Sequence, residues 1–169
     1  MKITLIANVS ANGKVLITEN PHYHEPREAL AFFIQYGNRT GNIILGRKTF
    51  DMLDGGFGNA KRAFPNVDLV IMSQSTEVIG NYTVLDTAQG VIKYYAEKGF
   101  EEILVGGGTG IYNLFLEQEL VTDIYFNYVP VIVGDGGVLG YSKKLATQFE
   151  VVEQKLLTPE IVQVHYSRK

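Results

Sequence analysis

The sequence contains no cysteine and only three histidines among its 169 residues. The lack of cysteine excludes disulfide bonds and thiolate zinc sites, and so few histidines disfavour a dedicated metal cage. His22 and His24 lie two residues apart, a spacing that would point them in different directions on a helix. We therefore predict no metal site and expect both histidines to be exposed loop residues.

Long apolar segments are missing as well. No run approaches the roughly 20 residues that a membrane-spanning helix needs. The opening stretch M-K-I-T-L-I-A-N-V-S alternates like a strand and ends too soon for a signal peptide. We expect a cytoplasmic protein without membrane association.

The chain also lacks a basic block, since 15 basic residues against 18 acidic ones give a net charge of −3. A nucleic-acid partner is therefore not expected, and any bound anion should be small. At 169 residues and 46% hydrophobic content, the chain fits a single domain spanning 1–169 with one buried core.

The most distinctive stretch is 102–116, which reads E-I-L-V-G-G-G-T-G-I-Y-N-L-F-L. Its pattern predicts a strand, a glycine turn and a helix. A helix start leaves unpaired backbone N–H groups and a partial positive charge, which suit a pyrophosphate. The same pattern also fits an ordinary strand-to-helix turn without a ligand. It is not the G-x-G-x-x-G fingerprint of a simple Rossmann domain.

A second turn of this kind follows the expected strand 42–45, where the sequence reads G-R-K-T-F from Gly46. Arg47, Lys48 and Thr49 supply two cations and a hydroxyl where phosphate oxygens could bind. The alternative is that the two cations only solvate a helix. Ser73 follows the next expected strand, at a strand end of the kind where α/β proteins bind ligands.

Strands and helices alternate along most of the chain, and the end reads as a hairpin. We therefore expect an α/β fold with a mixed, mostly parallel sheet and helices on both faces. The expected strands are 2–9, 42–45, 67–72, 82–85, 103–105, 121–133, 149–157 and 161–166. Gly37 and Gly41 are expected to close the first helix, and 54–59 is expected to be a loop.

Together these motifs resemble the dihydrofolate reductase superfamily, in the same order and over nearly the whole chain. I-I-L-G-R-K-T-F from Ile43, V-I-M-S-Q from Val70 and V-G-G-G from Val105 are similar to its cofactor motifs, the last of which usually holds a cis Gly-Gly bond. The resemblance implies a dihydrofolate reductase-like three-layer fold, ending in an antiparallel hairpin. It also implies that NADPH is held by Gly46, Arg47, Lys48, Thr49, Ser73, Gly107, Gly108, Thr109, Gly110 and Ile111.

Within the superfamily, S-A-N-G-K at 10–14 is similar to the S-x-D-G-K loop of the riboflavin-biosynthesis reductase domain, with Asn12 in place of the aspartate. The segments around Leu120 and Gly134 resemble that branch too. This implies a 5-amino-6-(5-phosphoribosylamino)uracil reductase-like enzyme that transfers hydride to a pyrimidine-ribosylamine or related heterocycle, as a homodimer. The sequence departs from the branch at 50–58, where F-D-M-L-D-G-G-F-G replaces an acidic, proline and arginine segment.

Two alternatives remain. The segment 23–28, Y-H-E-P-R-E, is similar to the folate reductase pattern that carries a carboxylate at the start of the first helix. In this interpretation Glu28 is the catalytic residue and the small-molecule substrate is a pterin, although an exposed acid favoured by the helix dipole fits Glu28 equally well. The other alternative is a nucleotide-binding protein without catalysis.

Overall fold

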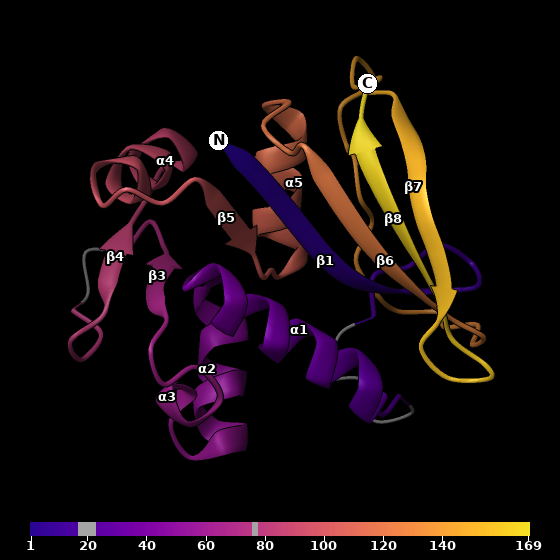
Figure 1. Ribbon diagram of the computed structural model, residues 1–169, viewed down its shortest axis with the longest axis horizontal. Helices are drawn as coiled ribbons and strands as arrows, with labels where there is room; N and C mark the ends of the chain where they lie inside the picture. Colours follow the sequence, from indigo (N-terminus) through magenta and orange to yellow (C-terminus); the bar gives the residue numbers. More distant parts are fainter. Residues whose placement is uncertain (17–22, 76–77) are drawn as a thin grey trace.

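The computed structural model describes residues 1–16, 23–75 and 78–169, which form one eight-stranded sheet covered by helices (Figure 1). The strands lie in the order β4-β3-β2-β5-β1-β6-β8-β7. Those from β1 to β6 pair in parallel, whereas β8 is antiparallel to both of its neighbours. Their bounds are β1 (Lys2–Ser10), β2 (Asn42–Gly46), β3 (Asp68–Met72), β4 (Thr83–Leu85), β5 (Glu102–Val105), β6 (Asp123–Val129), β7 (Phe149–Leu156) and β8 (Val162–Arg168).

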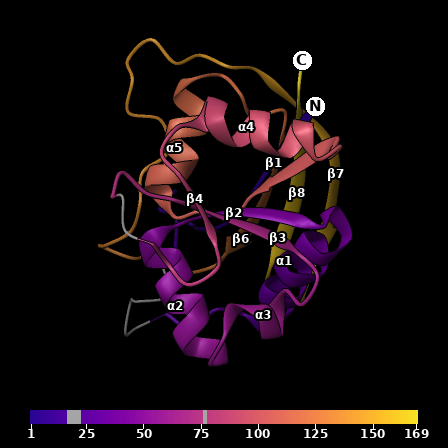
Figure 2. The same ribbon diagram turned by 90° about the vertical axis from the view of Figure 1, so that its left-hand side faces the viewer.

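Helices cover both faces of the sheet, as Figure 2 shows. Their bounds are α1 (Arg27–Thr40), α2 (Arg47–Phe57), α3 (Ala60–Ala63), α4 (Ala88–Glu97) and α5 (Thr109–Glu117). Residues of α4 and α5 share one core with Ile44, and residues of α1, α2 and α3 share the other with Ile43 and Leu45. Successive side chains of a strand point to opposite faces, so a sheet covered on both sides needs such continuous apolar strands. The predicted α/β, three-layer arrangement with a terminal hairpin is confirmed.

Two glycine-containing stretches differ from the prediction. The segment 54–59 is not a loop, because α2 continues through Phe57 and ends at Gly58, whose φ is 68°. Each helical glycine costs about 1 kcal/mol relative to alanine, and the packing of Leu53 and Phe57 against the core compensates. Gly37 does not close α1 but lies buried inside it, where a Cβ atom would stand 2.7 Å from the ring of Phe64. Gly41 caps the helix as predicted, with a φ of 73°.

The parallel pairing places the predicted cofactor turns at one edge of the sheet. β3, β2 and β5 are neighbours, and their carboxyl ends lead into the segment at Ser73, the start of α2 and the glycine turn before α5. Loops that follow neighbouring parallel strands meet at the same edge, which is where α/β sheets bind ligands.

A charged cluster lies at the opposite edge, around Glu102 at the start of β5. Tyr36 donates a 2.5 Å hydrogen bond to Glu102 Oε1, and Lys2 and Arg39 lie 3.6 and 3.3 Å from its carboxylate. Burial alone would raise the pKa of Glu102, but the hydrogen bond from Tyr36 and the two cations together lower it. The ionised carboxylate thus ties α1 to β1 and β5.

Replacing Glu102 with Gln is expected to lower the free energy of unfolding at pH 7 by about 1.5–3 kcal/mol, the value of a hydrogen bond to a charged group. Because the folded-state pKa is lowered, this stabilisation is present above the unfolded-state pKa and is lost as the pH falls through the folded-state value. Urea unfolding at pH 7 and pH 3 measures it, with exposed Glu101→Gln as the control. An equal difference between wild type and variant at both pH values would contradict the prediction.

Candidate functional site

The glycine turns after β2 and β5 touch each other. The Gly46 backbone N–H donates to the Gly107 carbonyl oxygen at 2.6 Å. A Cβ atom on Gly46 would stand 2.9 Å from Ile111, and one on Gly108 would stand 3.0 Å from the Thr49 hydroxyl. The structure therefore brings together predicted site residues from two turns that lie some 60 positions apart, at a spacing that only glycines permit.

Gly107 also packs against a buried tyrosine. Its φ is 101° and the peptide bond to Gly108 is cis, at the position where the resemblance placed one. A Cβ atom on Gly107 would lie 2.7 Å from the Tyr112 hydroxyl. That hydroxyl donates to the carbonyl oxygens of Ile6 at 2.6 Å and Gly106 at 3.2 Å, so Tyr112 joins the turn to β1.

The polar groups predicted to hold a phosphate lie beside this turn. Gly46 and Met72 are register partners on β2 and β3, so the residues that follow them, Arg47 and Ser73, come off adjacent strands. Arg47 Nε lies 2.9 Å from both carboxylate oxygens of Asp51, one helical turn along. Lys48 is exposed. The start of α2 therefore carries the exposed Lys48, the hydroxyl of Thr49, and Arg47, whose charge is shared with Asp51.

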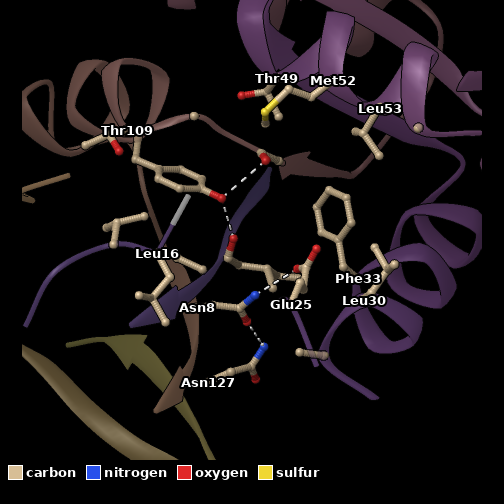
Figure 3. A pocket seen from close by; sticks show the side chains of 18 of the residues that line it. Asn8, Leu16, Glu25, Leu30, Phe33, Thr49, Met52, Leu53, Thr109 and Asn127 are labelled. Atoms are coloured by element: carbon tan, nitrogen blue, oxygen red, sulfur yellow. Dashed lines mark hydrogen bonds between the residues drawn. The ribbon is translucent and has the colours of Figure 1, made fainter. Parts of the chain in front are cut away.

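A cavity of about 670 Å³ opens beside the turns and reaches across β1 to the start of α1 (Figure 3). This volume suits a small organic ligand. Its wall combines glycine-turn and α2 residues with apolar side chains from α1 and α2. The lining residues include Ile6, Asn8, Glu25, Leu30, Phe33, Thr49, Leu53, Gly106, Gly108, Thr109, Tyr112 and Asn127.

Glu25 is the carboxylate among the described residues that line this cavity. It is partly buried just before α1, and Asn8 Nδ2 donates to its Oε1 at 2.8 Å (Figure 3). Burial raises the pKa of Glu25, and the hydrogen bond from Asn8 opposes this only in part. Burial, together with the negative charge of Glu25, also raises the pKa of Tyr23 and of Tyr112. The cavity therefore holds a carboxyl group that stays protonated to higher pH than a free one, as a proton donor needs.

The structure places Glu28 elsewhere. It lies exposed in the first turn of α1 and does not line the cavity, whereas Ala29 beside it is buried. Glu25 is not among the predicted site residues, because the similarity to folate reductases put the carboxylate two residues after Pro26. The sequence feature that could have indicated Glu25 is its place directly before Pro26, which starts the helix. The chain is still extended there and can direct a side chain toward the sheet.

The loop 10–14 forms the predicted turn, with a φ of 78° at Gly13 and a hydrogen bond from the Ser10 N–H to the Lys14 carbonyl oxygen. The side-chain amide of Asn12 bonds both backbone groups of Val133: it donates to the carbonyl oxygen at 2.9 Å and accepts from the N–H at 3.3 Å. An aspartate, as in the riboflavin-type loop, would lack the donor.

Other predictions concern metals and membranes. His22 lies outside the described residues, and His24 is exposed. Within 1–16, 23–75 and 78–169, no three His, Asp or Glu side chains cluster closely enough to hold a metal ion. None of the helices in these same segments is long and apolar enough to cross a bilayer.

Comparison with known proteins bears on the fold and the family. The sequence model of the dihydrofolate reductase family matches residues 2–155, while no curated protein matches significantly. A putative riboflavin biosynthesis protein from Shewanella sp. PV-4 superposes with a TM-score of 0.75 at 19% identity, covering 100% of this chain and 99% of its own. A pyrimidine reductase-like protein from Corynebacterium diphtheriae gives a TM-score of 0.75 at 14% identity, covering 99% and 92%. The two TM-scores show a shared fold, and the extent of the family match shows that the chain belongs to the dihydrofolate reductase family.

Proposed function

We propose that the protein is a reductase that uses NADPH to reduce a planar nitrogen heterocycle. The observation that carries the proposal is that one cavity is lined both by the proposed cofactor turns, at Gly106, Gly108 and Thr49, and by the carboxyl group of Glu25. When bound, NADPH supplies the hydride, and the protein supplies binding, orientation and exclusion of water.

The residues present fit this cofactor. Glycines at 46, 107 and 108 let the two turns pack directly on Ile111, Tyr112 and Thr49 beside the cavity, and α2 and α5 both begin at these turns, where a helix N-terminus favours a phosphate. Arg47, Lys48 and Ser73 would hold a 2′-phosphate, which is the group that distinguishes NADPH from NADH.

On the substrate side, apolar side chains from α1 and α2 provide a surface for a flat ring, among them Leu30, Phe33 and Leu53. Glu25 would hold the proton that the reduced substrate takes up, at the carboxyl oxygen that Asn8 does not contact. A positioned general acid of this kind typically raises the reaction rate by a factor of about 10² to 10⁴.

The charged side chains around the cavity indicate whether the substrate carries a phosphate group. Among the described residues that line it, Glu25 is charged and none is Lys or Arg, and 17–22 and 76–77 contain neither residue in the sequence. A phosphate on the substrate would need a cation. The cavity therefore favours an unphosphorylated aminopyrimidine or pterin over a phosphoribosyl compound. We also propose the homodimer that the resemblance implies.

Titration calorimetry is expected to show NADPH binding at least about tenfold tighter than NADH, because one hydrogen bond to a charged group is worth about 1.5–3 kcal/mol. The double change Arg47→Ala with Lys48→Ala should remove most of the difference. The matched control is Lys61→Ala with Arg62→Ala on α3, which removes the same charge from exposed positions. Equal affinity of the wild type for the two cofactors would overturn the 2′-phosphate assignment.

The activity itself is tested by following loss of the reduced nicotinamide absorbance with three substrates: 5-amino-6-(5-phosphoribosylamino)uracil, its dephosphorylated form and a dihydropterin. We expect at least one unphosphorylated compound to be reduced with the highest kcat/KM. Preference for the phosphorylated one would refute the charge argument. Tight NADPH binding with no turnover of any heterocycle would support nucleotide binding without catalysis.

A further inference from the structure

A row of three amide side chains crosses the sheet and ends at Glu25. Asn8 on β1, Asn127 on β6 and Gln163 on β8 are register partners on adjacent strands. Gln163 Nε2 donates to Asn127 Oδ1, Asn127 Nδ2 donates to Asn8 Oδ1, and Asn8 Nδ2 donates to Glu25 Oε1, each at 2.8 Å. Asn127 is fully buried and Gln163 is 2% exposed.

The carboxylate sets the direction of this row. An ionised carboxylate only accepts hydrogen bonds, so Asn8 must turn its NH₂ group toward Glu25. The Asn8 oxygen then faces Asn127, which must present its own NH₂ group, and the same logic fixes Gln163. If Asn8 turned over, its oxygen would face the Glu25 oxygen and two NH₂ groups would face each other.

The far end of the row is incomplete. Gln163 Oε1 is buried and has no hydrogen-bond partner in the part of the chain that the structure describes. A buried polar atom without a partner destabilises the fold. Gln163 therefore does not stabilise the core better than an apolar residue of its size would, and its contribution lies in the hydrogen bond that it donates toward Asn127.

We propose that Asn127 and Gln163 are positioning residues of the proposed reductase, which act through Asn8 to keep Glu25 Oε1 occupied and leave Oε2 to face the substrate. Figure 3 shows Asn127, Asn8 and Glu25 in line, with one Glu25 oxygen bound to Asn8 and the other turned away from it. Since Oε1 accepts from Asn8, a proton on Glu25 resides on Oε2. The row thus selects which oxygen of the carboxyl group delivers the proton.

The row is also expected to oppose protonation of Glu25, because aligned hydrogen bonds strengthen one another. Among the described residues, Glu25 raises the pKa of Tyr23 and of Tyr112, to which burial contributes more, so both tyrosines are neutral near pH 7. Replacing Asn127 or Gln163 should leave the side-chain amide of Asn8 free to flip. The hydrogen bond from Asn8 to Glu25 would then be weaker. The pKa of Glu25 should then rise further.

Carbon-13 NMR titration of glutamate carboxyl carbons in the intact protein, without cofactor or substrate, tests this. The Glu25 signal is identified by its loss in Glu25→Gln. In Asn127→Leu we expect its pKa to be higher by about one, the order expected for losing a hydrogen bond to a charged group. In Gln163→Met, which preserves volume and removes the unpartnered oxygen, we expect a smaller rise with no loss of stability.

The matched control is Asn42→Leu, because Asn42 is an equally buried sheet asparagine that bonds Glu102 and Leu104 instead. In Asn42→Leu the pKa of Glu25 should equal that of the wild type. An unchanged value in both Asn127→Leu and Gln163→Met, or an equal rise in the control, would overturn the inference. If Asn127→Leu does not fold, Gln163→Met alone decides. Because the titration needs no substrate, its result is independent of whether the proposed reductase activity is found.

Discussion

Replacing Glu25 with Gln is expected to lower kcat for reduction of the heterocycle by about 10² to 10⁴-fold, the usual contribution of a positioned general acid. Gln keeps an oxygen that can accept from Asn8, so the side chain should stay in place while its proton is lost. NADPH affinity should be nearly unchanged, because the cofactor turns come from β2, β3 and β5. Stopped-flow hydride transfer and calorimetry measure the two effects separately.

The pH dependence gives a second readout. Burial raises the pKa of Glu25, so the wild-type rate should fall as the pH rises through that value, and the Gln variant should lack this limb. A raised folded-state pKa also means that the associated stability is present below the unfolded-state pKa and lost as the pH rises through the folded-state value. Glu25→Gln should therefore be no less stable than the wild type at neutral pH.

The informative comparison is Glu28→Gln, which changes a carboxylate three residues away on the exposed side of α1. We expect the larger loss of rate in Glu25→Gln. A large loss in Glu28→Gln with none in Glu25→Gln would restore the assignment made from the folate reductase pattern and would place the proton donor outside the cavity.

Replacing Gly107 with Ala is expected to lower Tm by roughly 5–15 °C, because a Cβ is strained at φ 101° and would press on buried Tyr112. NADPH affinity should fall at least about tenfold, since moving the turn disturbs its contact with Gly46. Calorimetric unfolding and NADPH titration measure the two quantities.

The control is Gly55→Ala, on the exposed side of α2, where no atom lies within 4 Å of the added Cβ. It should be slightly more stable, by up to about 1 kcal/mol, because alanine favours a helix. If Gly107→Ala retained the wild-type Tm and NADPH affinity, the turn would be an ordinary connection between β5 and α5.

The features that could be predicted from the sequence are those set by residues adjacent to one another along the chain. The strand, glycine and helix order at 42–50 and 102–116 follows from local pattern, so both turns were predicted. The sequence did not predict that α2 runs through Gly55, because packing outweighs the local preference there. It also could not reveal the row from Asn8 to Asn127, whose hydrogen bond joins residues 119 positions apart. Glu25 and Glu28 differ in sequence by three positions, and only the start of α1 decides which one faces the sheet.

The place of β8 between β6 and β7 has a consequence for the order in which the site is assembled. Gln163 is supplied by a strand near the end of the chain, whereas Asn8 comes from the first strand. During synthesis, the proposed cofactor turns at Gly46 and Gly107 can form once β5 and α5 have emerged, whereas Asn127 on β6 and its donor Gln163 on β8 come later. Non-local pairing of this kind is slow to form. A chain interrupted before β8 would carry the proposed cofactor cleft without the hydrogen-bond donor that completes the row ending at Glu25.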